Sequence, residues 1–270
     1  MKIVIRADDC TEVWDGIFYK KLSHFPNITD WELKTLVDFV NYEKMYGREC
    51  FFECSEENIT RAIKAALAQP QRYSALKPPA LLTECTACPV RKGCDTRFVC
   101  HTTSVENATK IFESGSLKSA VRERNLSASV LKKETRNAAN DPKDYFEYVM
   151  FAWGNCQAGD RLVTERALKR FPTKEELSAP AFVPGVRFYF DYETLSRHPN
   201  AVQDGVLPVK VKNEVVLNDY VKAIIIPENH RASLEQLVPQ NLRERTFYLT
   251  NDTADIWAWS EKVMCFVEKL

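Results

Sequence analysis

The chain has 270 residues, of which 45% are hydrophobic and 27% are charged, as in a globular protein with one large domain or a domain plus an extension. Lysine plus arginine and aspartate plus glutamate both number 37, which excludes a strong overall positive charge that would attract nucleic acid. No apolar run approaches the roughly 18 residues of a transmembrane helix, so we expect no membrane association. The start MKIVIRADDC is too short and too acidic for a signal peptide. The nine cysteines are an odd number and lack the compact framework of a disulfide-rich secreted protein, so we expect a reducing compartment, the cytoplasm.

Residues 1–80 are expected to form an N-terminal αβ extension. Thr29 and Glu32 have the spacing of a capping box, which predicts that a helix begins there. The other expected elements are, in chain order, a strand at 2–6, a strand at 50–54, a helix at 59–67 that stops before Pro70, and a proline-rich linker at 70–79.

The segment FVCHTTSVENATKIFESGSL, residues 98–117, predicts a short strand, a polar turn, an amphipathic helix and a glycine stop. Thr103 is expected to cap this helix, with Glu106 three residues later, and Gly115 is expected to end it in the left-handed conformation. This arrangement places His101 and Thr102 at the mouth of a strand-to-helix turn. A polar side chain in that position is able to face a ligand instead of the core.

The later part of the chain predicts further strands and one closing helix. The segment VKNEVVLNDYVKAIIIPE predicts a strand that carries Glu214, a turn, and a second strand that ends at Pro227. With only eight glycines and neither GxGxxG nor GxxxxGK[ST], we do not expect a Rossmann or P-loop nucleotide site. The remaining expected elements are a half-buried strand at 186–192, a strand at 246–249, and a helix at 252–269 with Ile256, Trp259, Val263, Phe266 and Val267 facing inward.

Together these patterns resemble the ADP-ribosyltransferase fold over roughly residues 97–230. The resemblance is carried by a strand that ends in His and Thr, a helix that closes on Ile-x-x-x-Gly-x-Leu, and a later strand that opens on Glu-Val. The segment ETRNAANDPKDYFEYVMFAWGNCQAG looks most like the DarT branch, whose members modify DNA bases. The resemblance implies an α+β protein with an ADP-ribosyltransferase-like domain at 98–270. That domain would have a mixed or antiparallel β core with flanking helices, and would follow a cysteine-rich connector at 81–97.

The resemblance also implies a set of site residues and NAD as the substrate. Glu214 would be the catalytic carboxylate, which stabilises the ribose cation and takes the proton of the acceptor. Arg136 would pair with the pyrophosphate or help to deprotonate the acceptor. NAD itself would be held by His101, Thr102, Thr103, Tyr145 and Tyr148.

Other interpretations of these residues stay open. Without the resemblance, Glu214 is a solvated surface residue and His101 is a structural group. Arg136 is able to form a salt bridge with Glu134 or Asp141. The two tyrosines are spaced like core aromatics.

The chain also departs from the family. Lys212 replaces the Glu or Gln that arginine-modifying branches carry two residues before the catalytic Glu, and residues 153–156 replace the Pro-Arg-Ser turn of the DarT pattern. The acceptor therefore stays open among base, nucleotide, protein and small molecule, with nucleic acid favoured. An inhibitory partner protein is a further expectation from the resemblance. The alternative function is a non-catalytic interaction module that a metal stabilises.

A second group of residues has the spacing of metal ligands. Cys85, Cys88, Cys94 and Cys100 lie in TECTACPVRKGCDTRFVC. Two thiolates with two residues between them, as in Cys85 and Cys88, are able to bind one ion. Zinc and an iron–sulfur cluster both suit this spacing, and a loop of reduced thiols is the simple alternative. Because Cys100 and His101 are adjacent in a strand, their side chains are expected on opposite faces.

Overall fold

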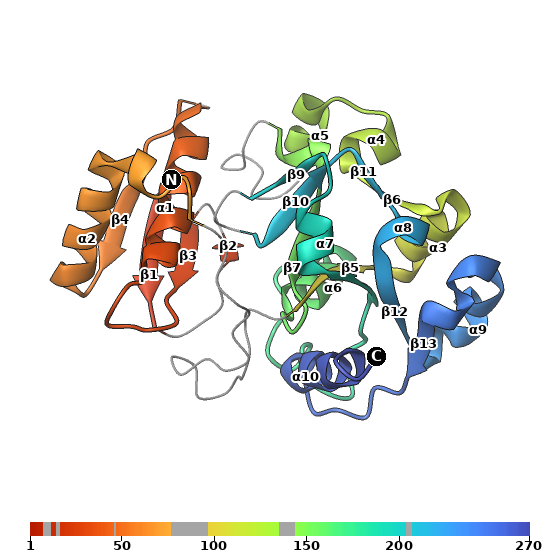
Figure 1. Cartoon of the computed structure of the whole chain (residues 1–270). Helices are drawn as coiled ribbons and strands as arrows, with labels where there is room; N and C mark the ends of the chain where they lie inside the picture. Colours follow the sequence, from red (N-terminus) through yellow and green to blue (C-terminus); the bar gives the residue numbers. More distant parts are fainter. Residues whose placement is uncertain (8–11, 15–16, 46, 77–96, 135–143, 204–206) are drawn as a thin grey trace. The chain divides into compact units, whose positions relative to one another are not determined.

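The computed structural model describes residues 1–7, 12–14, 17–45, 47–76, 97–134, 144–203 and 207–270 (Figure 1). The chain divides into two compact units. The first comprises Met1–Asp95, Ser119–Val149 and Asn200–Asn213, and the second comprises Thr96–Lys118, Met150–Pro199 and Glu214–Leu270. Both units contain helices and strands, so the α+β class is confirmed. Residues 98–270, expected as one domain, contribute to both units.

The first unit contains a four-stranded sheet with the order β2-β3-β1-β4. The central strand β1 pairs in parallel with β3 and β4, whereas β2 pairs with β3 in the antiparallel sense. The elements of this αβ region are β1 (Lys2–Arg6), β2 (Glu12–Trp14), β3 (Ile17–Lys21), α1 (Asp30–Met45), β4 (Phe51–Cys54), α2 (Glu57–Ala68) and η1 (Pro70–Arg72). The strands predicted at 2–6 and 50–54 and the helix predicted at 59–67 are confirmed.

Local sequence signals explain the two long helices of this unit. At the start of α1, the Glu32 backbone N–H donates to Thr29 Oγ1 at 3.2 Å and the Thr29 N–H donates to Glu32 Oε2 at 2.9 Å, which confirms the capping box. In α2, Ile59 and Ile63 are buried one turn apart in the core that α1 and the sheet share. The rest of the unit consists of α4 (Ala120–Arg124), α5 (Ala128–Glu134), η2 (Tyr145–Glu147), the start of β7 (Tyr148–Trp153), β9 (Ala201–Val202) and β10 (Val209–Lys212).

In the second unit the strands hydrogen-bond in the order β13-β12-β8-β5-β7. β5 is antiparallel to β7 and β8, β8 is antiparallel to β12, and β13 is parallel to β12, so the core is mixed and mostly antiparallel. The strands are β5 (Phe98–Thr103), β8 (Val186–Asp191), β12 (Val221–Pro227) and β13 (Thr246–Leu249), and β6 (Ser116–Lys118) pairs separately with β11 (Glu214–Val216). The helices are α3 (Val105–Ser114), α6 (Ala158–Leu168), α7 (Tyr192–Ser196), α8 (Leu217–Tyr220), η3 (Glu228–His230), α9 (Arg231–Leu234), η4 (Glu235–Leu237), η5 (Gln240–Arg245) and α10 (Ile256–Val267).

The strand β8 is buried on both faces, so the prediction of a half-buried strand at this place is wrong. On one face, Cys100 of β5 and Tyr189 of β8 are paired neighbours and pack into the core under α10. On the other face, the ring of Phe188 lies 5.8 Å from the ring of Phe112 in α3. Alternation along a strand reports only that neighbouring side chains point to opposite sides. It does not report whether the second side is covered as well.

Two helix starts differ from the predictions. The N-cap of α3 is Ser104, whose side chain accepts from the backbone of Asn107, because Thr103 is still the last residue of β5. The closing helix α10 begins at Ile256 instead of residue 252, since the Asp255 carboxylate accepts from the first backbone N–H groups of this helix. The predicted left-handed stop of α3 at Gly115 is confirmed by its φ of 67°.

Candidate functional site

His101 lies in β5 on the face that carries Phe151, whose ring centre is 6.1 Å from the imidazole. Its Nδ1 is 2.9 Å from the carbonyl oxygen of Met150. Because a carbonyl oxygen only accepts, Nδ1 carries the hydrogen and donates it, which makes Nε2 the acceptor of the neutral ring. Among the described residues no partner is recorded for Nε2. The ring therefore offers one hydrogen-bond acceptor of fixed identity.

Burial favours the neutral form of this imidazole. Burial lowers the pKa of His101 below its usual 6.5, the bond to Met150 opposes that change, and the charge of Arg166 adds to it. His101 is therefore neutral near pH 7 and able to accept a hydrogen bond from a ligand hydroxyl.

The two threonines predicted beside His101 point to different sides of β5. Thr103 is on the same face as His101, where it is 5% exposed. Thr102 is on the opposite face, where its Oγ1 lies 3.7 Å from the Cys100 sulfur. Its side chain packs so closely on Gly159 that a methyl group added there would lie 2.5 Å from Thr102. The geometry of Thr102 is that of a packing residue, and its role in NAD binding stays a prediction.

Glu214 is the first residue of β11 and is half-buried. In the antiparallel pair of β11 and β6 it lies opposite Lys118. Directly opposed residues of an antiparallel pair place their side chains on the same face of the sheet. Strand pairing fixes the backbone of Glu214, and a half-buried carboxylate at that position is an acceptor for hydrogen bonds from a ligand.

His101 and Glu214 both belong to the second unit, and a continuous segment connects the strands that carry them. β5 leads into α3, Gly115 ends that helix, and the chain enters β6, which is the strand that pairs with β11. The Leu217 backbone N–H donates to the Gly115 carbonyl at 2.9 Å and forms a second tie between these segments. His101 therefore lies at one end of the β5-α3-β6 segment, and Glu214 lies in β11, the strand that pairs with β6 at the other end.

Tyr145 and Tyr148 belong to the first unit, in η2 and at the start of β7. The Nζ of Lys210, a fully buried lysine, lies 4.5 Å from the ring centre of Tyr148 and 4.0 Å from that of Tyr42. A ring whose face already meets an ammonium group is less suited to stack on the cationic nicotinamide of NAD. Tyr148 has a packing role in this unit, and stacking by either tyrosine on nicotinamide stays a prediction.

Four of the predicted residues lie outside the described part of the chain: Arg136, Cys85, Cys88 and Cys94. Among the described residues no group of three or more His, Cys, Asp or Glu side chains is arranged to hold a metal. Cys100 faces the core under α10, as its alternation with His101 predicts. Burial raises the pKa of the Cys100 thiol to about 11, which disfavours the thiolate that zinc or an iron–sulfur cluster needs. The metal site stays a prediction.

A buried polar network in the second unit was not predicted from the sequence. The side chains of Arg187 and Asp160 are both 0% exposed and form an ion pair. Arg187 Nε donates to Asp160 Oδ2 at 2.8 Å, and the second carboxylate oxygen accepts from the backbone N–H of Gly185 at 2.7 Å. Arg187 also donates to the hydroxyls of Tyr189 and Ser260. The network joins β8 to α6 and α10.

This network also fixes the turn that follows β7. The Tyr189 hydroxyl donates to the Gly154 carbonyl at 2.9 Å. The sequence gives one partial signal, because Arg187 and Tyr189 are two residues apart in a strand and therefore share a face. It gives no signal for Asp160, which lies in a helix far along the chain.

Comparison with protein-family models, with curated proteins and with solved structures gave no match to this chain. No helix among the described residues has the length and apolar character to cross a bilayer.

Proposed function

We propose that this protein is an NAD-dependent ADP-ribosyltransferase, in which Glu214 is the catalytic carboxylate and His101 binds a ribose hydroxyl. The single observation that supports the proposal most is the state of His101. Its Nδ1 donates to Met150, so the neutral ring presents Nε2 as a lone acceptor on the face of β5 away from α10. A sugar hydroxyl is a donor that matches it.

In the proposed reaction the bond between ribose C1′ and the nicotinamide nitrogen breaks, and its electron pair leaves with nicotinamide. The carboxylate of Glu214 stabilises the cation that develops on the ribose. The acceptor then forms a bond to C1′ and loses a proton, which Glu214 takes. One fixed carboxylate is sufficient for both tasks because the proton leaves the acceptor only as the new bond forms.

The acceptor class that we favour is nucleic acid, on the resemblance to the DarT branch, and Arg136 would assist at the pyrophosphate or the acceptor. The purified protein is incubated with NAD labelled in its adenylate half, together with DNA, RNA, a protein extract or water alone. Label in the nucleic acid supports the acceptor class. Label in protein, or free ADP-ribose in water, supports the transferase but not this acceptor.

Glu214→Gln is expected to abolish transfer and to leave the fold intact, because the amide neither carries charge nor takes a proton. The matched control is Glu113→Gln, which removes an exposed carboxylate of α3 in the same unit. Equal transfer by Glu214→Gln and the control would refute the role of Glu214. NAD binding measured by calorimetry distinguishes the alternative, a non-catalytic module: absence of both binding and turnover would refute the transferase.

A further inference from the structure

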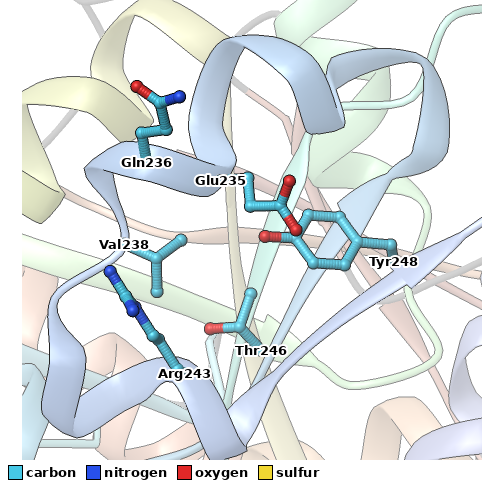
Figure 2. A pocket seen from close by; sticks show the side chains of 6 residues that line it. All are labelled: Glu235, Gln236, Val238, Arg243, Thr246 and Tyr248. Atoms are coloured by element: carbon cyan, nitrogen blue, oxygen red, sulfur yellow. The ribbon is translucent and has the colours of Figure 1, made fainter.

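A pocket of about 400 Å³ lies in the second unit, where η4, η5 and the start of β13 meet (Figure 2). This volume is within the range of roughly 300–1,000 Å³ that small-molecule sites have. Figure 2 shows Glu235 close to the Tyr248 hydroxyl on one side and Arg243 on the other, with Thr246 between them. The six lining residues are Glu235, Gln236, Val238, Arg243, Thr246 and Tyr248.

On one side of the pocket, Glu235 belongs to a group of paired charges that extends beyond the lining residues. Arg231 donates to Glu235 Oε1 from Nε at 3.2 Å and from Nη2 at 3.0 Å, and its guanidinium lies 4.5 Å over the centre of the Tyr248 ring. Arg231 also pairs with Glu228 at 3.4 Å. Since Arg231 is shared between two carboxylates, the group of Glu228, Arg231 and Glu235 carries one net negative charge. Because both bonds from Arg231 reach Oε1, Oε2 of this lining residue keeps its acceptor capacity.

The opposite side carries positive charge. Within the described part of the chain no acceptor is recorded for the guanidinium of Arg243, and this side chain lines the pocket. At the base, the Thr246 hydroxyl donates to the Leu242 carbonyl at 2.9 Å and therefore acts as an acceptor toward a ligand. Burial and the charge of Glu235 raise the pKa of Tyr248, so its hydroxyl stays protonated and able to donate.

A ligand that fits must be small and must carry a donor at one end and an anion at the other. We propose that this pocket binds a free α-amino acid as its zwitterion, with the ammonium group at Glu235 and the carboxylate at Arg243. A guanidinium is suited to a carboxylate because two of its N–H groups match the two oxygens. The site is separate from the NAD chemistry of Glu214 and does not depend on it.

The test is calorimetry of the full chain with each standard α-amino acid, followed by the best ligand with its amine acetylated or its carboxylate amidated. Each blocked form is expected to bind about 10-fold to 100-fold more weakly, since each lacks one charged hydrogen-bonding group. Arg243→Gln is expected to weaken the free amino acid by a similar factor. The same substitution should leave the affinity of the amidated form unchanged, because that form has no carboxylate to lose.

Glu244→Gln is the matched control, since Glu244 is an exposed neighbour of Arg243 that does not line the pocket. Unchanged circular dichroism shows that Arg243→Gln is folded. No saturable binding of any standard amino acid at millimolar concentration would overturn the proposal. Equal binding of the acetylated and the free form would also overturn it, because the pocket would then recognise an anion alone.

Discussion

The buried ion pair between Arg187 and Asp160 is expected to contribute strongly to the stability of the second unit. Asp160→Asn changes one oxygen to an NH2 group and removes the negative charge. Both oxygens of Asp160 accept hydrogen bonds, one from Arg187 and one from the Gly185 N–H. In either orientation of the asparagine amide, its NH2 group would face one of these N–H donors. The Arg187 guanidinium then stays buried without its counterion.

The size of the effect follows from the complete burial of the pair. Both side chains are 0% exposed, and removal of one partner of a buried pair costs about 3–5 kcal/mol because the other charge is left uncompensated. Domains have free energies of unfolding of about 5–15 kcal/mol, so this loss would be a large share of the total. Urea unfolding followed by tryptophan fluorescence measures it.

Two further variants separate the ion pair from general disruption. Replacing both partners by apolar residues, Asp160→Leu with Arg187→Met, is expected to recover part of the stability because no buried charge remains. Glu176→Gln is the control, since it breaks the exposed ion pair with Arg170 and should change stability little. An Asp160→Asn protein with a free energy of unfolding within about 1 kcal/mol of the wild type would refute the reasoning.

Three other predictions follow from the surroundings of single residues. Iodoacetamide should label exposed Cys265 before buried Cys100, read by mass spectrometry of peptides, because Cys100 is covered and burial raises its pKa to about 11; labelling of Cys100 as early as Cys265 would contradict its burial. Burial lowers the pKa of His101, so the unfolded state binds more protons just below pH 6.5, and the stability that depends on neutral His101 should be complete above that pH and lost as the pH falls. Urea unfolding at several pH values should show a weaker dependence in His101→Gln, with the remainder due to His198 and His230, whose pKa values burial also lowers; an unchanged dependence would contradict the contribution of His101. Gly159→Ala should destabilise the protein by about 1–3 kcal/mol in urea unfolding, since its methyl group would lie 2.5 Å from Thr102; an unchanged midpoint would show that the backbone yields there.

The elements that could be predicted from the sequence depend on local signals. The capping box of Thr29, the apolar spacing of α2 and the left-handed Gly115 each involve residues within one or two helical turns. The start of α3 was misplaced by one residue because Thr103 and Ser104 both carry hydroxyls, and pairing in β5 decides which of them caps. Local chemistry allowed both choices, and a long-range contact selected one.

In the candidate site, too, local sequence signals predicted some positions and long-range contacts decided others. The pattern placed Glu214 at a strand start, and that position is found. It placed His101 at a strand end, which is wrong, because β5 continues to Thr103 and pairs with β8 over its whole length. The side of β5 that Thr102 faces could have been predicted, since Thr102 and Cys100 are two residues apart and therefore share a face. The pairing of Arg187 with Asp160 could not have been predicted from the sequence, because it joins a strand to a helix through packing that no local pattern encodes.

The two faces of β5 have different consequences for the proposed chemistry. On the α10 face, Thr102 lies against Gly159 and Gly185, and the Asp160 carboxylate accepts from that same Gly185 N–H. The backbone of β5 is thereby packed on one side against residues that the buried network holds together. His101 projects from the other face of this fixed backbone, and its bond to Met150 sets the tautomer. A binding group is effective when its supporting residues hold its orientation. The buried network therefore belongs to the proposed function as its support, although none of its members need touch NAD.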